Sequence, residues 1–225
     1  MLTNKKKDLV FFDVDNTIFN GYTQKCFIKY LYKNKYIKFI DLIFSYIWFI
    51  FYKLNFVKNI DIGIKFYLRF LKGLKYVDFL VIVENFFNDN KDLIFDSAKY
   101  EIKNHIENNR QIILVSTSLY PIVDLIRKYV GADDLIATKL ENIGDKLTGN
   151  IDGFAVYGDR KLYEVKKYIS NYMDELINIK TYFYSDHHSD YELLNYVDYP
   201  VVVNPDNKLH NIAVKNNWKI LNYKK

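Results

Sequence analysis

The sequence has few of the residues that build cross-linked or loop-rich proteins. Its 225 residues include one cysteine, three prolines and eight glycines. The single cysteine, Cys26, excludes an internal disulfide and also a zinc site built from several cysteines. Half of the residues are hydrophobic and 26% are charged, a balance that indicates a globular chain rather than a disordered one.

The N-terminal region lacks the long apolar run of a signal peptide. Its apolar stretch, Leu9–Phe12, stops at Asp13. We therefore expect a cytoplasmic protein. The net charge of +5 would suit an anionic substrate or an anionic membrane surface. The lysines are scattered and no recognisable nucleic-acid-binding motif accompanies them, so we expect no nucleic-acid binding.

Short apolar runs that end in polar residues predict the buried strands of a parallel sheet. Segments with helical spacing at 96–108, 121–129 and 163–173 separate them. Strands alternating with helices predict an α/β fold, and paired glycines at 147–156 suggest a small hairpin or loop excursion. The predicted strands are Leu9–Phe12, Ile112–Val115, Thr181–Tyr184 and Val201–Val203, with Leu135–Thr138 as a weaker fifth.

The stretch from Tyr22 to Asn90 has no strand signal and predicts several helices rich in aromatic and aliphatic residues. It lies between the first and second strands, where a doubly wound sheet needs only one crossover helix. We therefore predict a catalytic core of residues 1–20 and 91–225 and an inserted all-helical cap of residues 21–90.

Polar and acidic side chains follow three of the predicted strands. Because ligands bind beyond the carboxyl ends of parallel strands, these groups should converge at one edge of the sheet. Gathered carboxylates repel one another, and Mg²⁺ resolves that repulsion together with water and a substrate phosphate. The groups are Asp13 with Asp15, Ser116 with Thr117 and Ser118, and Asp186 with Asp190.

These residues suit a reaction that passes through an acyl phosphate. The carboxylate of Asp13 can attack phosphorus, and Asp15, two residues later, is placed for proton transfer. Asp13 and Asp186 would be metal ligands, and Asp190 either a ligand or a support. Taken alone, an Asp-x-Asp after a strand is often a turn or a helix cap, so the ordered combination carries the hypothesis.

The ordered motifs resemble those of the haloacid dehalogenase-like hydrolases, and the branch resembled is subfamily IB, the phosphoserine-phosphatase-like group. The resemblance covers residues 8–20 and about 95–222. The segments that carry it are Asp13-Val14-Asp15-Asn16-Thr17, Val115-Ser116-Thr117-Ser118, Gly158-Asp159-Arg160-Lys161 and Tyr184-Ser185-Asp186-His187-His188-Ser189-Asp190.

The resemblance implies a Rossmann-like parallel sheet under a helical cap. It implies that Asp13 is the nucleophile, that Asp15 is the acid/base, and that the backbone carbonyl of Asp15 joins Asp13 and Asp186 on Mg²⁺. It also implies that Ser116, with Thr117 beside it, binds the phosphoryl group and that Lys161 neutralises its charge.

Two positions depart from the family pattern. Tyr22 stands where phosphoserine phosphatases carry a glutamate that binds the substrate amine, which puts phosphoserine as the substrate in doubt. Ser189 stands where asparagine is common, and its hydroxyl can still donate one hydrogen bond. For His187 and His188 we weigh solvent-facing loop positions against substrate contact, proton transfer or a transition-metal site.

Residues 39–56 form an apolar stretch with only four polar residues and with lysines on both flanks. Three interpretations stay open: a helix buried in the cap bundle, which we favour, an interfacial helix that touches the inner face of the membrane, and a transmembrane helix. The last would separate Asp13 from Asp186 unless the chain crossed the membrane again.

The function that these observations favour is Mg²⁺-dependent hydrolysis of a phosphate monoester, with a small phosphorylated metabolite or a lysolipid-like phosphate as substrate. A phosphotransferase of the same family would share every motif. Three further functions stay open: a membrane-associated lipid-phosphate phosphatase, a receiver-like signalling domain, and a non-catalytic phosphate- or lipid-binding protein.

Overall fold

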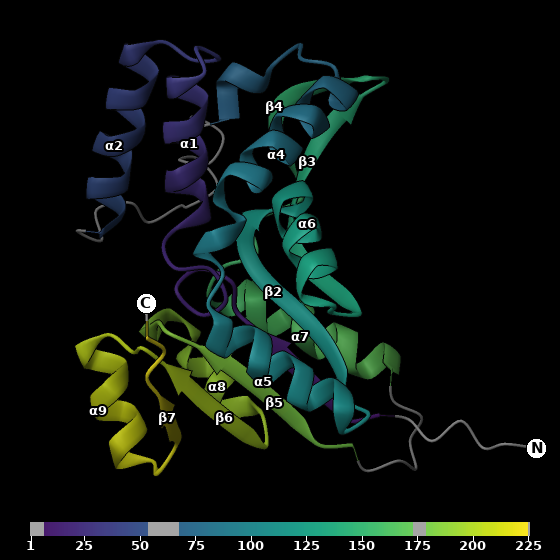
Figure 1. Ribbon diagram of the computed structural model, residues 1–225, viewed down its shortest axis with the longest axis vertical. Coiled ribbons are helices and arrows are strands. Elements are labelled where there is room, and N and C mark those ends of the chain that lie inside the picture. The colour runs from purple at the N-terminus through teal and green to yellow at the C-terminus, as the bar shows by residue number, and fades with distance from the viewer. Residues whose placement is uncertain (1–6, 54–67, 173–178, 225) are drawn as a thin grey trace, which may run out of the picture.

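The computed structural model describes residues 7–53, 68–172 and 179–224, without the side chains of residues 48–50, 52 and 53. At its centre is a seven-stranded sheet in the order β4-β3-β2-β1-β5-β6-β7 (Figure 1). All strand pairs are parallel except β3 with β4, which confirms the predicted α/β class. The strands are β1 (Leu9–Phe12), β2 (Gln111–Leu119), β3 (Asp134–Ile143), β4 (Lys146–Asp152), β5 (Thr181–Ser185), β6 (Tyr199–Val203) and β7 (Lys219–Leu221).

Helices cover both faces of the sheet, which is why its central strand is apolar without interruption. Val10 and Phe12 of β1 belong to one buried cluster with residues of α5 and α6, whereas Leu9 and Phe11 belong to a second cluster with α7, α8 and α9. These helices are α5 (Asp96–Glu107), α6 (Tyr120–Val130), α7 (Asp159–Tyr172), α8 (Tyr191–Tyr196) and α9 (Asn207–Lys215).

The excursion predicted at 147–156 is part of a longer hairpin. Strands β3 and β4 pair antiparallel around a turn at Gly144 and Asp145, and Gly149 lies inside β4 rather than in a turn. Gly149 has φ +83°, and a Cβ there would lie 3.3 Å from the Cβ of Lys72. The absence of a side chain at Gly149 therefore permits a close approach between β4 and the segment after residue 68.

Between β1 and β2 the described residues form helices, as predicted, and take part in three isolated bridges, Asp15 with Phe19, Phe19 with Ile94, and Lys75 with Lys146 of β4. The segments that enter and leave this region are hydrogen-bonded to each other, from Asn20 N–H to the Leu93 carbonyl (2.7 Å) and from Phe95 N–H to the Ile18 carbonyl (2.9 Å). The division into a core and a cap of residues 21–90 stays a prediction. The helices before α5 are α1 (Thr23–Lys33), α2 (Phe39–Lys53), η1 (Arg69–Leu71), α4 (Tyr76–Asn90) and η2 (Lys91–Leu93).

Helix α2 accounts for most of the predicted apolar stretch at 39–56, and residues 54–56 lie outside the described part. The favoured interpretation, a helix buried in the cap bundle, is wrong for its described side chains. Phe39 is 61% exposed and Ile40 is 49% exposed. Within the described ranges, no helix is both long and apolar enough to cross a membrane.

A buried histidine on α5 links this helix to β5. His105 Nδ1 accepts a hydrogen bond from the Arg110 guanidinium (2.9 Å), so the neutral ring carries its proton on Nε2 and donates it to Tyr184 Oη (2.8 Å). Tyr184 in turn donates to Glu101 (3.2 Å). Burial, followed by the charges of Arg110 and Lys219, lowers the pKa of His105 to about 4.

Candidate active site

The predicted site residues come together at the carboxyl ends of the central strands. Asp13 directly follows β1, and its N–H donates to the Tyr184 carbonyl (2.9 Å), which carries the β1–β5 pairing one step further. Asp186 directly follows β5, and Lys161 lies in the first turn of α7. Parallel pairing of β1 with β5 therefore fixes the separation between the two segments that carry the acids.

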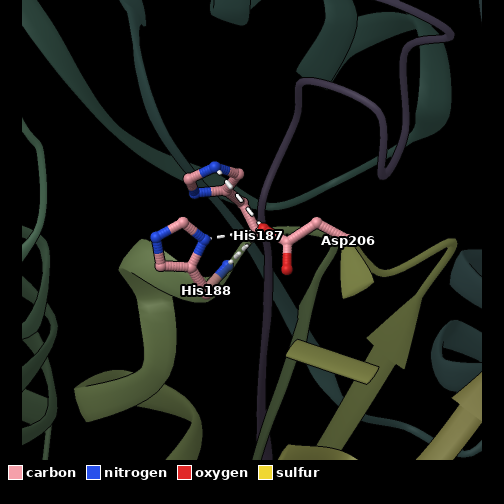
Figure 2. Close-up of side chains that lie close together, drawn as sticks. All are labelled: His187, His188 and Asp206. Carbon is pink, nitrogen blue, oxygen red and sulfur yellow. Dashed lines mark hydrogen bonds and ion pairs between the residues drawn. The ribbon is translucent and has the colours of Figure 1, made fainter. Parts of the chain in front are cut away.

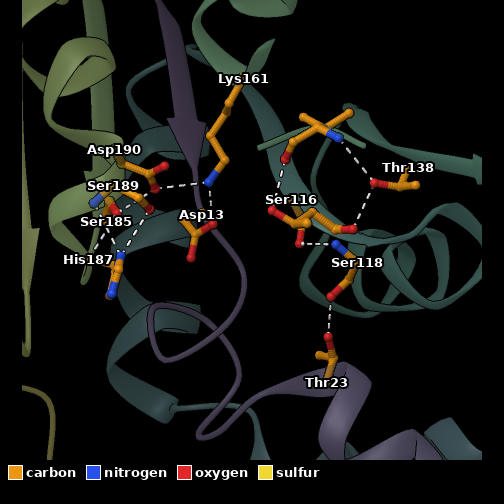
Figure 3. Close-up of polar contacts among 12 residues, drawn as sticks. Asp13, Thr23, Ser116, Ser118, Thr138, Lys161, Ser185, His187, Ser189 and Asp190 are labelled. Carbon is orange, nitrogen blue, oxygen red and sulfur yellow. Dashed lines mark hydrogen bonds and ion pairs between the residues drawn. The ribbon is translucent and has the colours of Figure 1, made fainter. Parts of the chain in front are cut away.

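Lys161 lies between two carboxylates, as Figure 3 shows. Its Nζ is 2.6 Å from Asp13 Oδ1 and 2.9 Å from Asp190 Oδ2, and the residue is 3% exposed. Burial alone would lower the pKa of Lys161, but attraction to Asp13 and Asp190 outweighs it and raises the pKa. Lys161 is therefore a fixed cation beside the predicted nucleophile.

Asp190 is engaged in holding this lysine. Its Oδ2 accepts hydrogen bonds from both Lys161 Nζ and Ser185 Oγ, the latter at 2.7 Å, and the residue is 5% exposed. From the sequence, we predict that Asp190 either binds the metal directly or supports the residues that do. These contacts favour the supporting role.

The acids together carry more negative charge than Lys161 offsets. Burial raises the pKa of Asp13. The attraction of Lys161 lowers this pKa, and the repulsion of Asp190 and Asp15 raises it further. Burial and the charges of Asp13, Asp190 and Asp15 raise the pKa of Asp186 well above its usual value. A divalent cation would relieve this repulsion, and a donor set made only of oxygen atoms suits Mg²⁺. The residues present thus fit the predicted metal.

Asp15 is fixed by the start of the first inserted helix. Its Oδ1 accepts the backbone N–H of Thr23 (2.9 Å), the first residue of α1. The Thr23 hydroxyl forms a hydrogen bond with Ser118 Oγ, a contact that joins α1 to the end of β2 (Figure 3). Burial raises the pKa of Asp15, although the hydrogen bonds from Thr23 and Ser118 oppose the shift. A raised pKa favours the protonated form of a carboxyl group, which is the form that can donate a proton to a leaving group.

The two predicted phosphate-binding residues of β2 differ in their surroundings. Ser116 is 1% exposed, and its Oγ accepts the N–H of Ser118 (3.1 Å). The Thr117 hydroxyl instead donates to the Val156 carbonyl (2.8 Å), so this side chain supports the neighbouring loop. The geometry therefore favours Ser116, rather than the Thr117 side chain, for contact with a phosphoryl group.

His187 and His188 form a hydrogen-bonded cluster with Asp206 at the start of α9 (Figure 2). His188 Nδ1 is 2.7 Å and His187 Nε2 is 3.6 Å from Asp206 Oδ2. Because His187 Nδ1 accepts the N–H of Ser189 (3.1 Å), the neutral ring carries its proton on Nε2, facing Asp206. The His188 ring thus donates to the carboxylate, whereas His187 Nε2 lies beyond hydrogen-bond distance from it. One ligand atom of each of the three residues lies within 4.8 Å of the others, so the transition-metal interpretation stays open.

The charges in this cluster are consistent with that arrangement. Burial, followed by the charge of His188, lowers the pKa of His187. Burial alone would raise the pKa of Asp206, but hydrogen bonds from His188 and from the Leu209 N–H hold it below its usual value. The two histidine side chains are 37% and 35% exposed, so they are half-buried rather than fully solvent-facing.

Several polar residues around the site were given no role from the sequence. Thr23 and Ser118 position Asp15, Ser185 supports Asp190, and Asp206 holds His188. Ser118 and Ser185 lie inside the motifs that carry the resemblance, which is the signal that could have drawn attention to them. Thr23 begins a helix without an acidic or capping signature, so no local pattern could have identified it.

Comparisons with known proteins agree with this geometry. The haloacid dehalogenase-like hydrolase family matches residues 10–195. Phosphoserine phosphatase SerB1 of Mycobacterium tuberculosis is 26% identical over 95% of this chain and 70% of its own length, and a histidinol-phosphatase of Neisseria meningitidis is 27% identical over 97% of this chain and its full length.

Two solved structures share the fold. A Bordetella pertussis protein of unknown function superposes with a TM-score of 0.88 and 22% identity, over 96% of this chain and 99% of that one. A phosphoserine phosphatase described as a phospho-aspartyl intermediate analogue gives a TM-score of 0.69 and 20% identity, over 98% and 95%. The resemblance drawn from the motifs is thereby confirmed, and the chain belongs to the haloacid dehalogenase-like hydrolase family, with similarity to its phosphoserine-phosphatase-like branch.

Proposed function

We propose that this protein hydrolyses phosphate monoesters in a Mg²⁺-dependent reaction that passes through an aspartyl phosphate on Asp13. The observation that carries the proposal is Lys161 Nζ, 2.6 Å from Asp13 Oδ1 in a buried cluster of acids at the ends of the parallel strands. The relatives named as phosphatases support the reaction class, and they differ in their named substrates.

In the first step a carboxylate oxygen of Asp13 forms a bond to phosphorus while the ester P–O bond breaks. Asp15 gives its proton to the departing alkoxide, and Lys161 offsets the charge on the phosphoryl oxygens. Ser116 donates a hydrogen bond to the same group. When bound by Asp13, Asp186 and the Asp15 carbonyl, Mg²⁺ supplies Lewis-acid stabilisation of the phosphoryl oxygens.

In the second step Asp15, now ionised, takes a proton from water, and the resulting hydroxide attacks phosphorus. The bond between phosphorus and Asp13 breaks, which releases inorganic phosphate and restores both carboxyl groups. The Thr23 N–H at 2.9 Å holds Asp15 in place for both transfers.

The substrate class that we propose is a small phosphorylated metabolite or an amphiphilic phosphate. The hydroxyl of Tyr22 lies near Asp186, and burial and that charge raise its pKa, so the position offers a neutral phenol. A neutral group there gives no ion pair to a substrate amine, which argues against phosphoserine.

The test is turnover of p-nitrophenyl phosphate with Mg²⁺, with EDTA, and by the Asp13→Asn variant. With Mg²⁺ we expect activity from the wild type and from Asp152→Asn, a matched change at an exposed position. We expect no activity with EDTA or from Asp13→Asn. Undiminished turnover by Asp13→Asn would overturn the assignment. Nitrophenolate released in excess of phosphate when an alcohol is added would indicate phosphotransfer instead.

A further inference from the structure

Among the described side chains of helix α2, Asp41 and Ser45 are half-buried, whereas an apolar stripe is turned to solvent. This stripe repeats at helical spacing and contains no polar residue among the described side chains. Its members, with their exposed fractions, are Phe39 61%, Ile40 49%, Ile43 36% and Ile47 42%. Phe44, 41% exposed, lies at the border of this stripe, with the Arg69 guanidinium 5.6 Å from its ring centroid. A helix that faced only water would present the opposite side.

The orientation of α2 is fixed by contacts on its inward side. Asp41 Oδ1 pairs with Arg69 at 2.7 Å, and Ser45 Oγ donates to the Asp41 carbonyl at 2.7 Å. Leu42 packs against the main buried cluster. The helix therefore cannot turn its apolar stripe inward without breaking this ion pair and exposing Leu42.

Positive and aromatic residues are exposed in the segment that leads into α2. Lys33, Lys35 and Lys38 are exposed next to the N-terminal end of α2, and Tyr36 is 49% exposed. In Figure 1, α2 lies at the outer edge of the molecule beside α1, so a flat surface can reach it. Lysines beside an apolar stripe complement anionic lipid headgroups, whereas a second copy of this chain, with the same net charge of +5, would repel.

We propose that α2 docks this protein on an anionic lipid bilayer, with the helix lying in the plane of the interface. Fifteen residues span about 22 Å at 1.5 Å per residue, and the apolar stripe would enter the boundary between headgroups and acyl chains. Lysines near the surface add electrostatic attraction that falls with salt. The docking is independent of the phosphatase proposal, because it requires none of the acids at the strand ends.

The experiment is flotation of the full chain with phosphatidylcholine vesicles, with and without phosphatidylglycerol, at low and high salt. We expect the wild type to float with the anionic vesicles and less so as salt rises. The Ile40→Asp/Ile47→Asp variant should bind at least about tenfold more weakly. In the wild type both isoleucine side chains would move from water into the apolar part of the interface, and the aspartates lose this gain. Val214→Asp, a matched change at a 58% exposed position on α9, should bind as the wild type does.

Wild type that stays unbound at low salt would overturn the proposal, as would equal flotation of the Ile40→Asp/Ile47→Asp variant. Equal binding to both vesicle types would overturn the anionic assignment. A wild-type dimer that this variant converts to a monomer would identify a second copy as the occupant instead. Lys35→Glu/Lys38→Glu, which leaves the apolar stripe untouched, should reduce binding to anionic vesicles alone. Flotation of Asp13→Asn keeps the result separate from any failure of the catalytic proposal.

Discussion

The Asp15→Asn variant should separate the two chemical steps. With p-nitrophenyl phosphate the leaving group departs as a stabilised phenolate, so the first step needs no acid. Hydrolysis of the aspartyl phosphate still needs a base to activate water. The variant should therefore become phosphorylated quickly and then stop, whereas the wild type should turn over without a burst.

The size of the effect follows from the contacts of Asp15. The amide oxygen of the variant can still accept the Thr23 N–H at 2.9 Å, so the position of the side chain should persist. Loss of a positioned general base slows its step by roughly 10²–10⁴. Because one Asp13 accepts the phosphoryl group, the burst should approach one nitrophenolate per chain, followed by a steady rate that is lower than the wild-type rate by up to that factor.

Rapid-quench kinetics at pH 8 measures both phases, with Asp152→Asn as the matched control. The reasoning would be refuted if the burst and the steady phase slowed by the same factor, since Asp15 would then serve the first step even with this leaving group. Wild-type turnover by the variant would remove Asp15 from proton transfer altogether.

Further predictions concern the charges and hydrogen bonds around the site. Lys161→Met leaves Asp13 and Asp190 buried without their cation, so the free energy of unfolding at pH 8, measured in urea, should fall by up to about 3–5 kcal/mol; unchanged stability would contradict the pairing. Thr23→Val keeps the N–H but loses the hydroxyl contact, which should cost about 1 kcal/mol of stability and lower kcat more than it changes KM. His105 is protonated more readily in the unfolded chain (pKa 6.5) than in the fold (about 4), so stability should be retained above pH 6.5 and fall by up to about 3 kcal/mol towards pH 4. The His105→Gln variant should lack this part of the pH dependence in acid titrations of unfolding, and an equal slope would refute the assignment.

The sequence predicted well which acidic residues follow the ends of the central strands. Leu9–Phe12 and Thr181–Tyr184 are short apolar runs in a sheet covered on both faces, so their polar successors, Asp13 and Asp186, mark the carboxyl edge. Alternating strands and helices were enough to place these acids together. The three-residue β7, Lys219–Leu221, is too short to produce such a pattern and was not predicted.

Contacts between distant side chains could not be predicted. Thr23 and Ser118 are 95 residues apart, and their hydrogen bond depends on how α1 approaches β2. The orientation of α2 was likewise hidden, because a helix with apolar residues on all sides has no periodic signal to choose its buried face. In the fold, Asp41 pairs with Arg69 and Leu42 packs against the main buried cluster, two contacts with residues distant in the sequence. The cytoplasmic location and the boundaries of the cap remain predictions.

Chemical trapping of the intermediate tests the central claim most directly. Borohydride reduces an acyl phosphate to an alcohol, so quenching the Asp15→Asn variant during its burst should convert the side chain at position 13 to homoserine, identified by peptide mass spectrometry. The account predicts this conversion at Asp13, dependent on both substrate and Mg²⁺. Conversion at another aspartate, or an unmodified Asp13 after a full burst, would contradict it.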